Sequence, residues 1–298
     1  MKLATVLLLA LAAAPVVARS EAWHYLGETP PEDTPKRFPL PTSPGFFAAE
    51  RIAISHDRRT IYFTELNGYN ADSINQLQVI SCNDGQWSKP ALVYSGPRGM
   101  PPALAVDENR LLLNDRVAER RPNGTLDERA DFRPGQHCHY LQQTKSGRYY
   151  FAVVNQAGTE FDIVRTAPPG RDAPDEKMGF NLVMKPPFPV TLDFFMARDE
   201  SYVILFLCGA RDYPCAGASD LFIAFRQPKG GWSTPRSLGA AINTPVPAEW
   251  RWGPYVTDDG KYLFFTRESF VGEEKKADIR VEWVRFDRLR ERLERESR

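Results

Sequence analysis

One short pattern recurs five times along this chain: a strand, a turn that carries Asp or Gly, and then an aromatic strand. A unit of this kind cannot bury both of its faces alone, so neighbouring copies must stack against one another. Short strands at this spacing are typical of the blades of a β-propeller. The turn positions of the five units are Asp57, Asp107, Ser146, Asp199 and Asp259. A third strand follows four of the units, beginning at Ile74, Glu160, Asp220 and Asp278.

A longer repeat supports this interpretation. The segments LQVISCNDGQWSKPALV, from Leu77, and FIAFRQPKGGWSTPRSL, from Phe222, share an alternating strand, a Gly-containing turn and the sequence Trp-Ser-x-Pro. Trp87 and Trp232 are therefore equivalent, and we expect both to pack within blades rather than to bind a ligand. The second unit has no clear third strand between residues 114 and 136.

We therefore predict an all-β protein, a β-propeller of five blades, with six blades as the alternative. Ring closure usually needs both chain ends in one blade, and the last unit shows only three strands. The segment AWHYLGE, residues 22–28, could supply the fourth. Residues 285–298 place apolar side chains on one helical face among charges, which predicts a short C-terminal helix or, alternatively, a frayed tail.

The first residues have the features of an export signal. Lys2 precedes the apolar run LATVLLLALAAA, which is too short to span a bilayer. Val16 and Ala18 fit the small-residue cleavage pattern, which predicts cleavage after Ala18 and a mature chain that begins at Arg19. We expect residues 1–18 to be a signal peptide and residues 19–298 a single propeller domain, periplasmic or secreted, with no integral membrane segment.

The amino-acid composition limits the kinds of partner that we expect for this chain. The 38 basic and 38 acidic residues balance, which gives no electrostatic reason to expect nucleic acid as a partner. We expect a monomer without a cofactor. Because an exported chain meets an oxidising compartment, Cys208 and Cys215 are predicted to form a disulfide across their turn-rich loop. Cys82 and Cys138 are expected to be separate, partly buried thiols.

Three segments carry a family resemblance. TDDGKYLFFTR at residues 257–267, SHDRRTIYFTE at residues 55–65 and SDLFIAFRQPKGGWSTPRSLGAAINTP at residues 219–245 resemble the TolB-like, WD-like propeller repeats of bacterial exported proteins. The resemblance covers nearly all of the mature chain. It implies the fold and an exported location, and it implies little about activity, since such propellers have many roles.

Two candidate sites have simple structural explanations. The turn aspartates are expected to cap their turns by accepting backbone N–H bonds. His137, Cys138 and His139 include metal-ligating groups, but along a strand the two histidines face away from the cysteine. No third ligand for a metal is identifiable, so no metal site is predicted and a structural or channel-lining role is favoured.

The repeat register suggests a ligand site. Counting back from each turn aligns five residues at the start of the innermost strands: Glu50, Met100, His139, Leu192 and Trp252. Arg51, Asp193, Trp250 and the pair Glu249 and Arg251 lie close to these positions in the sequence. Acidic, basic and aromatic groups would then meet at one mouth of the channel, where a small molecule, glycan or peptide could bind. The alternative is that the tryptophans pack between blades while the charges pair. The predicted ligand-binding residues are Glu50, His139, Asp193, Glu249, Arg251 and Trp252.

The motifs of common catalytic sites are absent. The sequence contains no Gly-x-Ser-x-Gly, His-Glu-x-x-His or Gly-x-x-x-x-Gly-Lys pattern. We therefore predict no catalytic residues and an exported, non-catalytic propeller that binds a protein, peptide or glycan at the channel mouth. The alternative is a periplasmic or secreted, glycosidase-like hydrolase that uses carboxylates such as Glu50 with Asp193 or Glu249.

Overall fold

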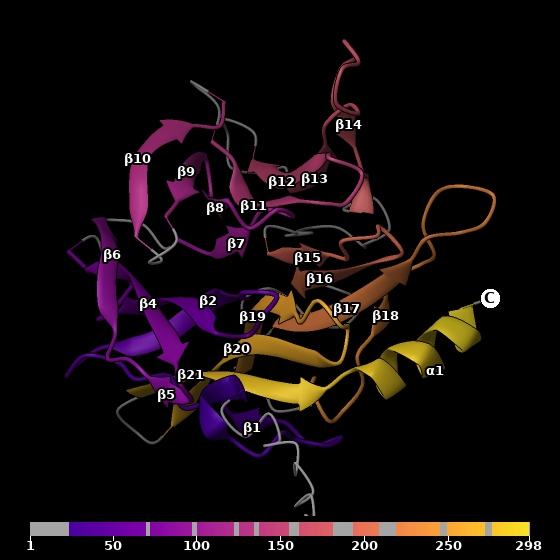
Figure 1. The fold of residues 1–298 in the computed structure, drawn as a ribbon. Helices are drawn as coiled ribbons and strands as arrows, with labels where there is room; N and C mark the ends of the chain where they lie inside the picture. The colour runs from indigo at the N-terminus through magenta and orange to yellow at the C-terminus, as the bar shows by residue number, and fades with distance from the viewer. Residues whose placement is uncertain are drawn as a thin grey trace, which may run out of the picture.

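The computed structural model describes residues 24–69, 72–96, 100–121, 125–133, 137–154, 161–180, 193–208, 219–244, 249–271 and 276–297. Within these residues, five antiparallel sheets are arranged around a central axis (Figure 1). The predicted five-bladed β-propeller is thereby confirmed. In each blade the chain runs outward from the axis, so the first strand of every sheet belongs to the inner ring.

The strands of each blade follow in order from the axis. Blade 1 contains β2 (Phe47–Ile54), β3 (Thr60–Leu66), β4 (Asn75–Asn83) and β5 (Gln86–Trp87), with β6 (Ala91–Gly96) also paired to β4. Blade 2 contains β7 (Pro102–Leu104), β8 (Arg110–Leu113), β9 (Arg116–Arg120) and β10 (Leu126–Asp131). Blade 3 contains β11 (His139–Gln143), β12 (Tyr149–Val154), β13 (Phe161–Arg165) and β14 (Glu176–Lys177). Blade 4 contains β15 (Phe194–Met196), β16 (Tyr202–Cys208), β17 (Ser219–Phe225) and β18 (Arg236–Ser237). Blade 5 contains β19 (Glu249–Val256), β20 (Tyr262–Val271), β21 (Lys276–Arg285) and, outermost, β1 (Lys36–Arg37).

The turns between the first two strands confirm the structural interpretation of the aspartates. The Asp57 carboxylate accepts a hydrogen bond from the backbone N–H of Arg59 at 3.0 Å, and Asp259 accepts one from Lys261 at 3.0 Å. Asp107 and Asp199 make the equivalent contact. The next residue has a positive φ in every blade, and the five residues concerned are Arg58, Glu108, Gly147, Glu200 and Gly260. The blades thus share one turn geometry even where Gly is replaced.

Closure of the ring differs from the prediction in its residues. The N-terminal part of the chain does complete the last blade, but the pairing strand is β1, in which Lys36 lies opposite Trp283. The prediction that residues 22–28 supply this strand was wrong, because His24–Gly27 form a short 3-10 helix, η1. Its Tyr25 is buried against the ring of Trp283, with centroids 5.2 Å apart. The segment therefore packs on blade 5 without extending its sheet.

The structure also tests three further predictions from the sequence. Blade 2 has its third and fourth strands, β9 and β10, within the segment where no third strand was evident. The C-terminal helix is confirmed as α1 (Asp287–Ser297), with Leu293 buried on the rim (Figure 1). Trp87 and Trp232 pack against core residues at the start of outer strands or bridges.

The cysteines divide into two groups. Cys82 and Cys138 are buried and are not in disulfide bonds, as expected. Cys215 lies outside the described residues, and with it the predicted disulfide to Cys208.

None of the helices among the described residues has the length and apolar character needed to cross a bilayer.

Candidate functional site at the channel mouth

Two predicted site residues meet at one mouth of the channel, on either side of a tyrosine hydroxyl. Glu50 lies in β2 of blade 1, and Asp193 immediately precedes β15 of blade 4. The hydroxyl oxygen of Tyr140, from β11 of blade 3, lies 2.6 Å from Glu50 Oε2 and 2.9 Å from Asp193 Oδ2. The backbone N–H of Gly253, from blade 5, also donates to Asp193 Oδ2 at 3.3 Å. Four of the five blades therefore contribute to this cluster, and we call its two acids, Glu50 and Asp193, the carboxyl pair.

Local β-bulges bring these residues to the axis. The inner strands of blades 1, 3 and 5 each change register near their start. In each bulge one residue takes a positive φ: Glu50 at 69°, Tyr140 at 55° and Gly253 at 62°. A bulge inserts an extra residue and redirects the side chains around it. As a result Tyr140, rather than the predicted His139, reaches the axis.

The geometry requires a shared proton. A phenol has one proton to donate, so Tyr140 can donate to only one of the two carboxyl groups. The second short contact is a hydrogen bond only if the other carboxyl group is itself protonated and donates to the phenol oxygen. Burial, followed by the charge of Glu50, raises the pKa of Asp193 to about 8. Burial also raises the pKa of Glu50, against the opposing effects of Tyr140 and Arg51.

The carboxyl pair is partly open to solvent. The residues Glu50 and Asp193 retain partial exposure, although the protein around them desolvates both groups. Beside the pair, the ring of Tyr69 is 53% exposed, with its centroid 6.3 Å from that of the buried Trp252. Desolvation by the surrounding protein, then the charges of Glu50, Glu268 and Asp193, raise the pKa of Tyr69.

A buried arginine lies directly behind the carboxyl pair. The guanidinium group of Arg51 donates to the carbonyl oxygens of Pro102 at 3.0 Å, Tyr140 at 3.2 Å, Leu141 at 2.9 Å and Pro101 at 3.4 Å. These carbonyls belong to blades 2 and 3, so Arg51 of blade 1 connects three blades. Its charge also faces the ring of Tyr140, 5.0 Å from the centroid. Burial lowers the pKa of Arg51 to about 10, so the side chain stays charged at neutral pH.

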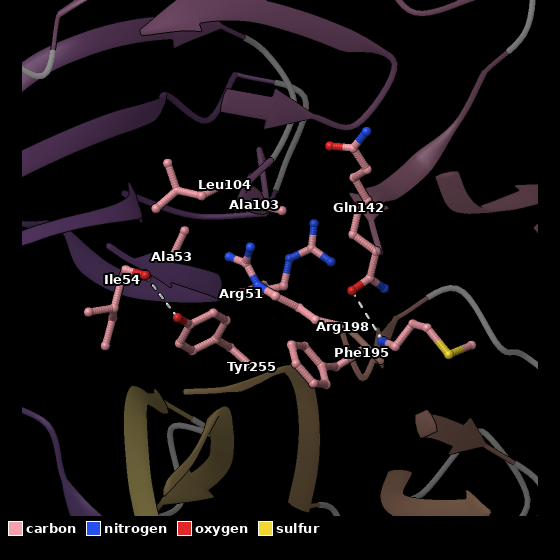
Figure 2. Close-up of a pocket in the computed structure, with 11 residues that line it drawn as sticks. Arg51, Ala53, Ile54, Ala103, Leu104, Gln142, Phe195, Arg198 and Tyr255 are labelled. Carbon is pink, nitrogen blue, oxygen red and sulfur yellow. Dashed lines mark hydrogen bonds between the residues drawn. The ribbon is translucent and has the colours of Figure 1, made fainter. Parts of the chain in front are cut away.

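The channel is narrow behind Arg51. A cavity of about 20 Å³ lies there, which is enough for about one water molecule. Figure 2 shows the side chains of Arg51, Gln142 and Arg198 converging on it. Gln142 Oε1 accepts a hydrogen bond from the backbone N–H of Met196, whereas the buried Gln142 Nε2 has no hydrogen-bond partner among the described residues.

The other predicted site residues have different surroundings. Glu249 and Arg251 form an ion pair with each other, and Arg267 pairs with Glu249 at 2.5 Å. Arg251 also lies 3.5 Å from Asp220 of blade 4. Burial acts to raise the pKa of Glu249, but hydrogen bonds from Thr244 and Arg267 hold this pKa below its usual value. This network matches the alternative in which these charges pair.

Four further positions complete the predicted ring. His139 is half-buried at the start of β11, and Trp252 packs beside Tyr69. Met100 packs against the apolar core near blade 2, and Leu192 lies outside the described residues. Burial raises the pKa of Cys138 to about 12, so its thiol stays protonated and is a poor metal ligand. In the described part of the chain, no three metal-ligating side chains gather at one point.

The fold and the site define the class of protein: a five-bladed β-propeller with a partly exposed carboxyl pair at one mouth. Comparison with known proteins agrees with the fold. An endo-arabinase of Bacteroides thetaiotaomicron is similar with a TM-score of 0.50 and 12% identity, over 85% of this chain and 97% of the other. The catalytic domain of the GH62 α-L-arabinofuranosidase of Coprinopsis cinerea has a TM-score of 0.50 and 9% identity, over 87% and 99%.

A third similar structure is hydrazine synthase of Kuenenia stuttgartiensis, with a TM-score of 0.41 and 12% identity. The match covers 74% of this chain and 64% of that one, so this chain spans less than two thirds of its length. No protein-family model and no curated protein sequence matches this chain. At these identities the likeness shows the fold alone.

The carboxyl pair should make stability depend on pH. In the unfolded chain Asp193 loses its proton near the ordinary value of 3.8, whereas in the folded protein it holds the proton up to about pH 8. Between these values the folded state binds more protons, so the free energy of unfolding should fall as the pH rises, by at most about 1.4 kcal/mol per unit. Urea unfolding across this range would show the slope.

Asp193→Asn should flatten that slope, because an amide does not titrate, while the exposed Asp172→Asn should leave it unchanged. Equal slopes in the wild type and Asp193→Asn would show that Asp193 is ionised throughout the range.

Proposed function

We propose that this chain is an exported, non-catalytic propeller of the TolB-like kind that binds a protein, peptide or glycan ligand at the mouth where the inner strands begin. The observation that carries the proposal is the carboxyl pair, in which Glu50 and Asp193 meet on one tyrosine hydroxyl and remain partly exposed. A pair that shares a proton both donates and accepts hydrogen bonds, which suits the hydroxyl or amino groups of a ligand.

The surrounding side chains support this assignment. Tyr69 and Trp252 supply an aromatic wall beside the acids, and pockets of this kind combine apolar surface with a few polar groups. Glu249 and Arg251 are already ion-paired, so we assign them the role of holding β19 in position. His139 precedes Tyr140 in β11. Ligand contact is therefore assigned chiefly to Glu50 and Asp193, with Tyr69 added and the buried Trp252 supporting Tyr69 from behind.

The position of Tyr140 favours binding over hydrolysis. In a glycosidase, two carboxyl groups flank the bond that is broken, with that bond in the space between them. Here the Tyr140 hydroxyl occupies the space between Glu50 and Asp193. A sugar would have to displace a buried side chain whose ring also packs on Arg51.

The binding proposal is tested with a panel of peptides and glycans, followed by calorimetry on the compounds that bind. Glu50→Gln should weaken binding by about tenfold or more, because it removes the charge of the pair and a hydrogen bond to a charged group contributes about 1.5–3 kcal/mol. Asp193→Asn, which resembles the protonated acid, should weaken binding less. The exposed pair Glu119→Gln and Asp172→Asn serves as the matched control. Binding that is unaffected by both site variants would remove the mouth as the site.

A hydrolase is the second candidate, and one observation favours it. Asp193 stays protonated near neutral pH, as a general acid requires. The two similar structures named as an endo-arabinase and an arabinofuranosidase suggest which substrates to try first, arabinan and aryl arabinofuranosides. Turnover by the wild type that is lost in Asp193→Asn would replace the binding function with this one.

A further inference from the structure

A groove lies on the rim of the propeller, away from the carboxyl pair. It has a volume of about 440 Å³ and runs between α1 and the chain that follows β18. Leu238, Ile242 and Val284 form the buried apolar base of the groove. The apolar surface open to a ligand comes from the half-buried Leu289 and the exposed Ala240 and Ala241. We call this the α1 groove.

Arginines form one wall of the α1 groove. Arg288, Arg292 and Arg295 follow one another at helical spacing, so they share one face of α1, and all three are exposed. Arg288 contacts Glu32 at 3.3 Å. Neither Arg292 nor Arg295 has an ion-pair partner in the part of the chain that the structure describes. Asp33 is the one acidic side chain among the described residues that line the groove.

This charge distribution differs from that of an ordinary solvated helix. Elsewhere on α1, Glu296 pairs with Arg236 of β18, and Asp287 pairs with Arg285. Arg288 is also paired, so Arg292 and Arg295 are the groove-lining arginines of α1 that have no ion-pair partner among the described residues. Guanidinium groups there have donors available for carboxylates, which they bind in a two-pronged geometry.

We infer that the α1 groove binds an extended acidic segment of a partner protein, in which carboxylate and apolar side chains alternate. The carboxylates would pair with Arg292 and Arg295, and the apolar side chains would cover the apolar surface at Leu289. An extended peptide fits because β18 is the edge strand of blade 4 and leads directly into the groove. The inference is independent of the mouth site and of the ligand bound there.

Fluorescence anisotropy with a labelled, alternating Glu-Leu octapeptide tests the inference on the full mature chain. The double charge reversal Arg292→Glu and Arg295→Glu should weaken binding by about tenfold or more, since two charge-assisted contacts become repulsive. Ala241→Trp should weaken it as well, because it fills the groove without changing charge. The matched control is Lys89→Glu with Lys229→Glu, two exposed positions elsewhere that give the same change in net charge.

Other outcomes would overturn the inference. If the groove variants and the control pair weaken binding of the Glu-Leu peptide equally, that binding is nonspecific. Equal binding of a Lys-Leu octapeptide would show that the groove does not distinguish acidic from basic peptides. Binding to phosphatidylglycerol vesicles that depends on Arg292 and Arg295, without peptide binding, would assign the groove to a lipid surface instead. Thermal melting of each variant confirms that it is folded.

Discussion

Arg51→Met should lower the free energy of unfolding by about 3–5 kcal/mol, which is the range for an uncompensated buried charge or hydrogen-bond network. The Arg51 side chain is 1% exposed, and methionine would leave four backbone carbonyls without their donor. Those carbonyls belong to two other blades, so the loss affects the ring rather than one strand. Urea unfolding monitored by tryptophan fluorescence measures the change.

Two controls sharpen this test. Arg171→Met, at an exposed position, should change stability by less than about 0.5 kcal/mol. Arg51→Lys should recover only part of the loss, because one ammonium group cannot reach carbonyls on both blades with the planar fork of arginine. A loss below about 1 kcal/mol in Arg51→Met would show that water replaces the guanidinium group easily.

Gly253→Ala should be the second severe substitution, with an expected loss of about 3 kcal/mol or more. A β-carbon at this position would lie 2.6 Å from the carbonyl carbon of Glu50 and 2.7 Å from the nitrogen of Arg51. Both are backbone atoms of the neighbouring inner strand, so the clash can be relieved only by separating blades 1 and 5. The positive φ of 62° adds strain for any other residue.

Gly85→Ala separates the two causes. Gly85 also has a positive φ, of 80°, but a β-carbon there would meet no atom within 4 Å. It should therefore cost only about 1–2 kcal/mol, the strain of the left-handed conformation. Similar losses at Gly253 and Gly85 would show that the close approach of the two strands contributes nothing. Because Gly253 N–H donates to Asp193, its variant should also change the pH dependence of stability.

The repeat predicted the fold because its signal lies in residues that act locally. Asp57, Asp199 and Asp259 cap turns within two residues of themselves, so their spacing alone marks the hairpins. The third strand of blade 2 was hard to recognise because β9, RVAER, has two apolar residues among three charged ones. The closing strand β1 has two residues, too few to produce a periodic pattern.

The site was predicted only in part, for a physical reason. Counting from the turns placed Glu50 correctly and pointed to Asp193, but it selected His139 where Tyr140 reaches the axis. The count assumes a regular strand, and a bulge of one residue exchanges the faces of the side chains. Gly253, inside an otherwise aromatic strand, was the available signal of such a bulge. The ion pair of Glu249 and Arg251 follows from strand alternation, which puts both on one face.

Ring closure by β1 also sets the order in which the molecule can be completed. Lys36 and Arg37 are among the first residues of the propeller to be synthesised, and their partners Trp283 and Glu282 are among the last. The contact joins nearly the full length of the chain, and contacts so distant in sequence form slowly. Four blades can therefore assemble on a growing chain while the fifth stays open. The slow step therefore comes last: the propeller becomes a closed ring only when its two ends meet.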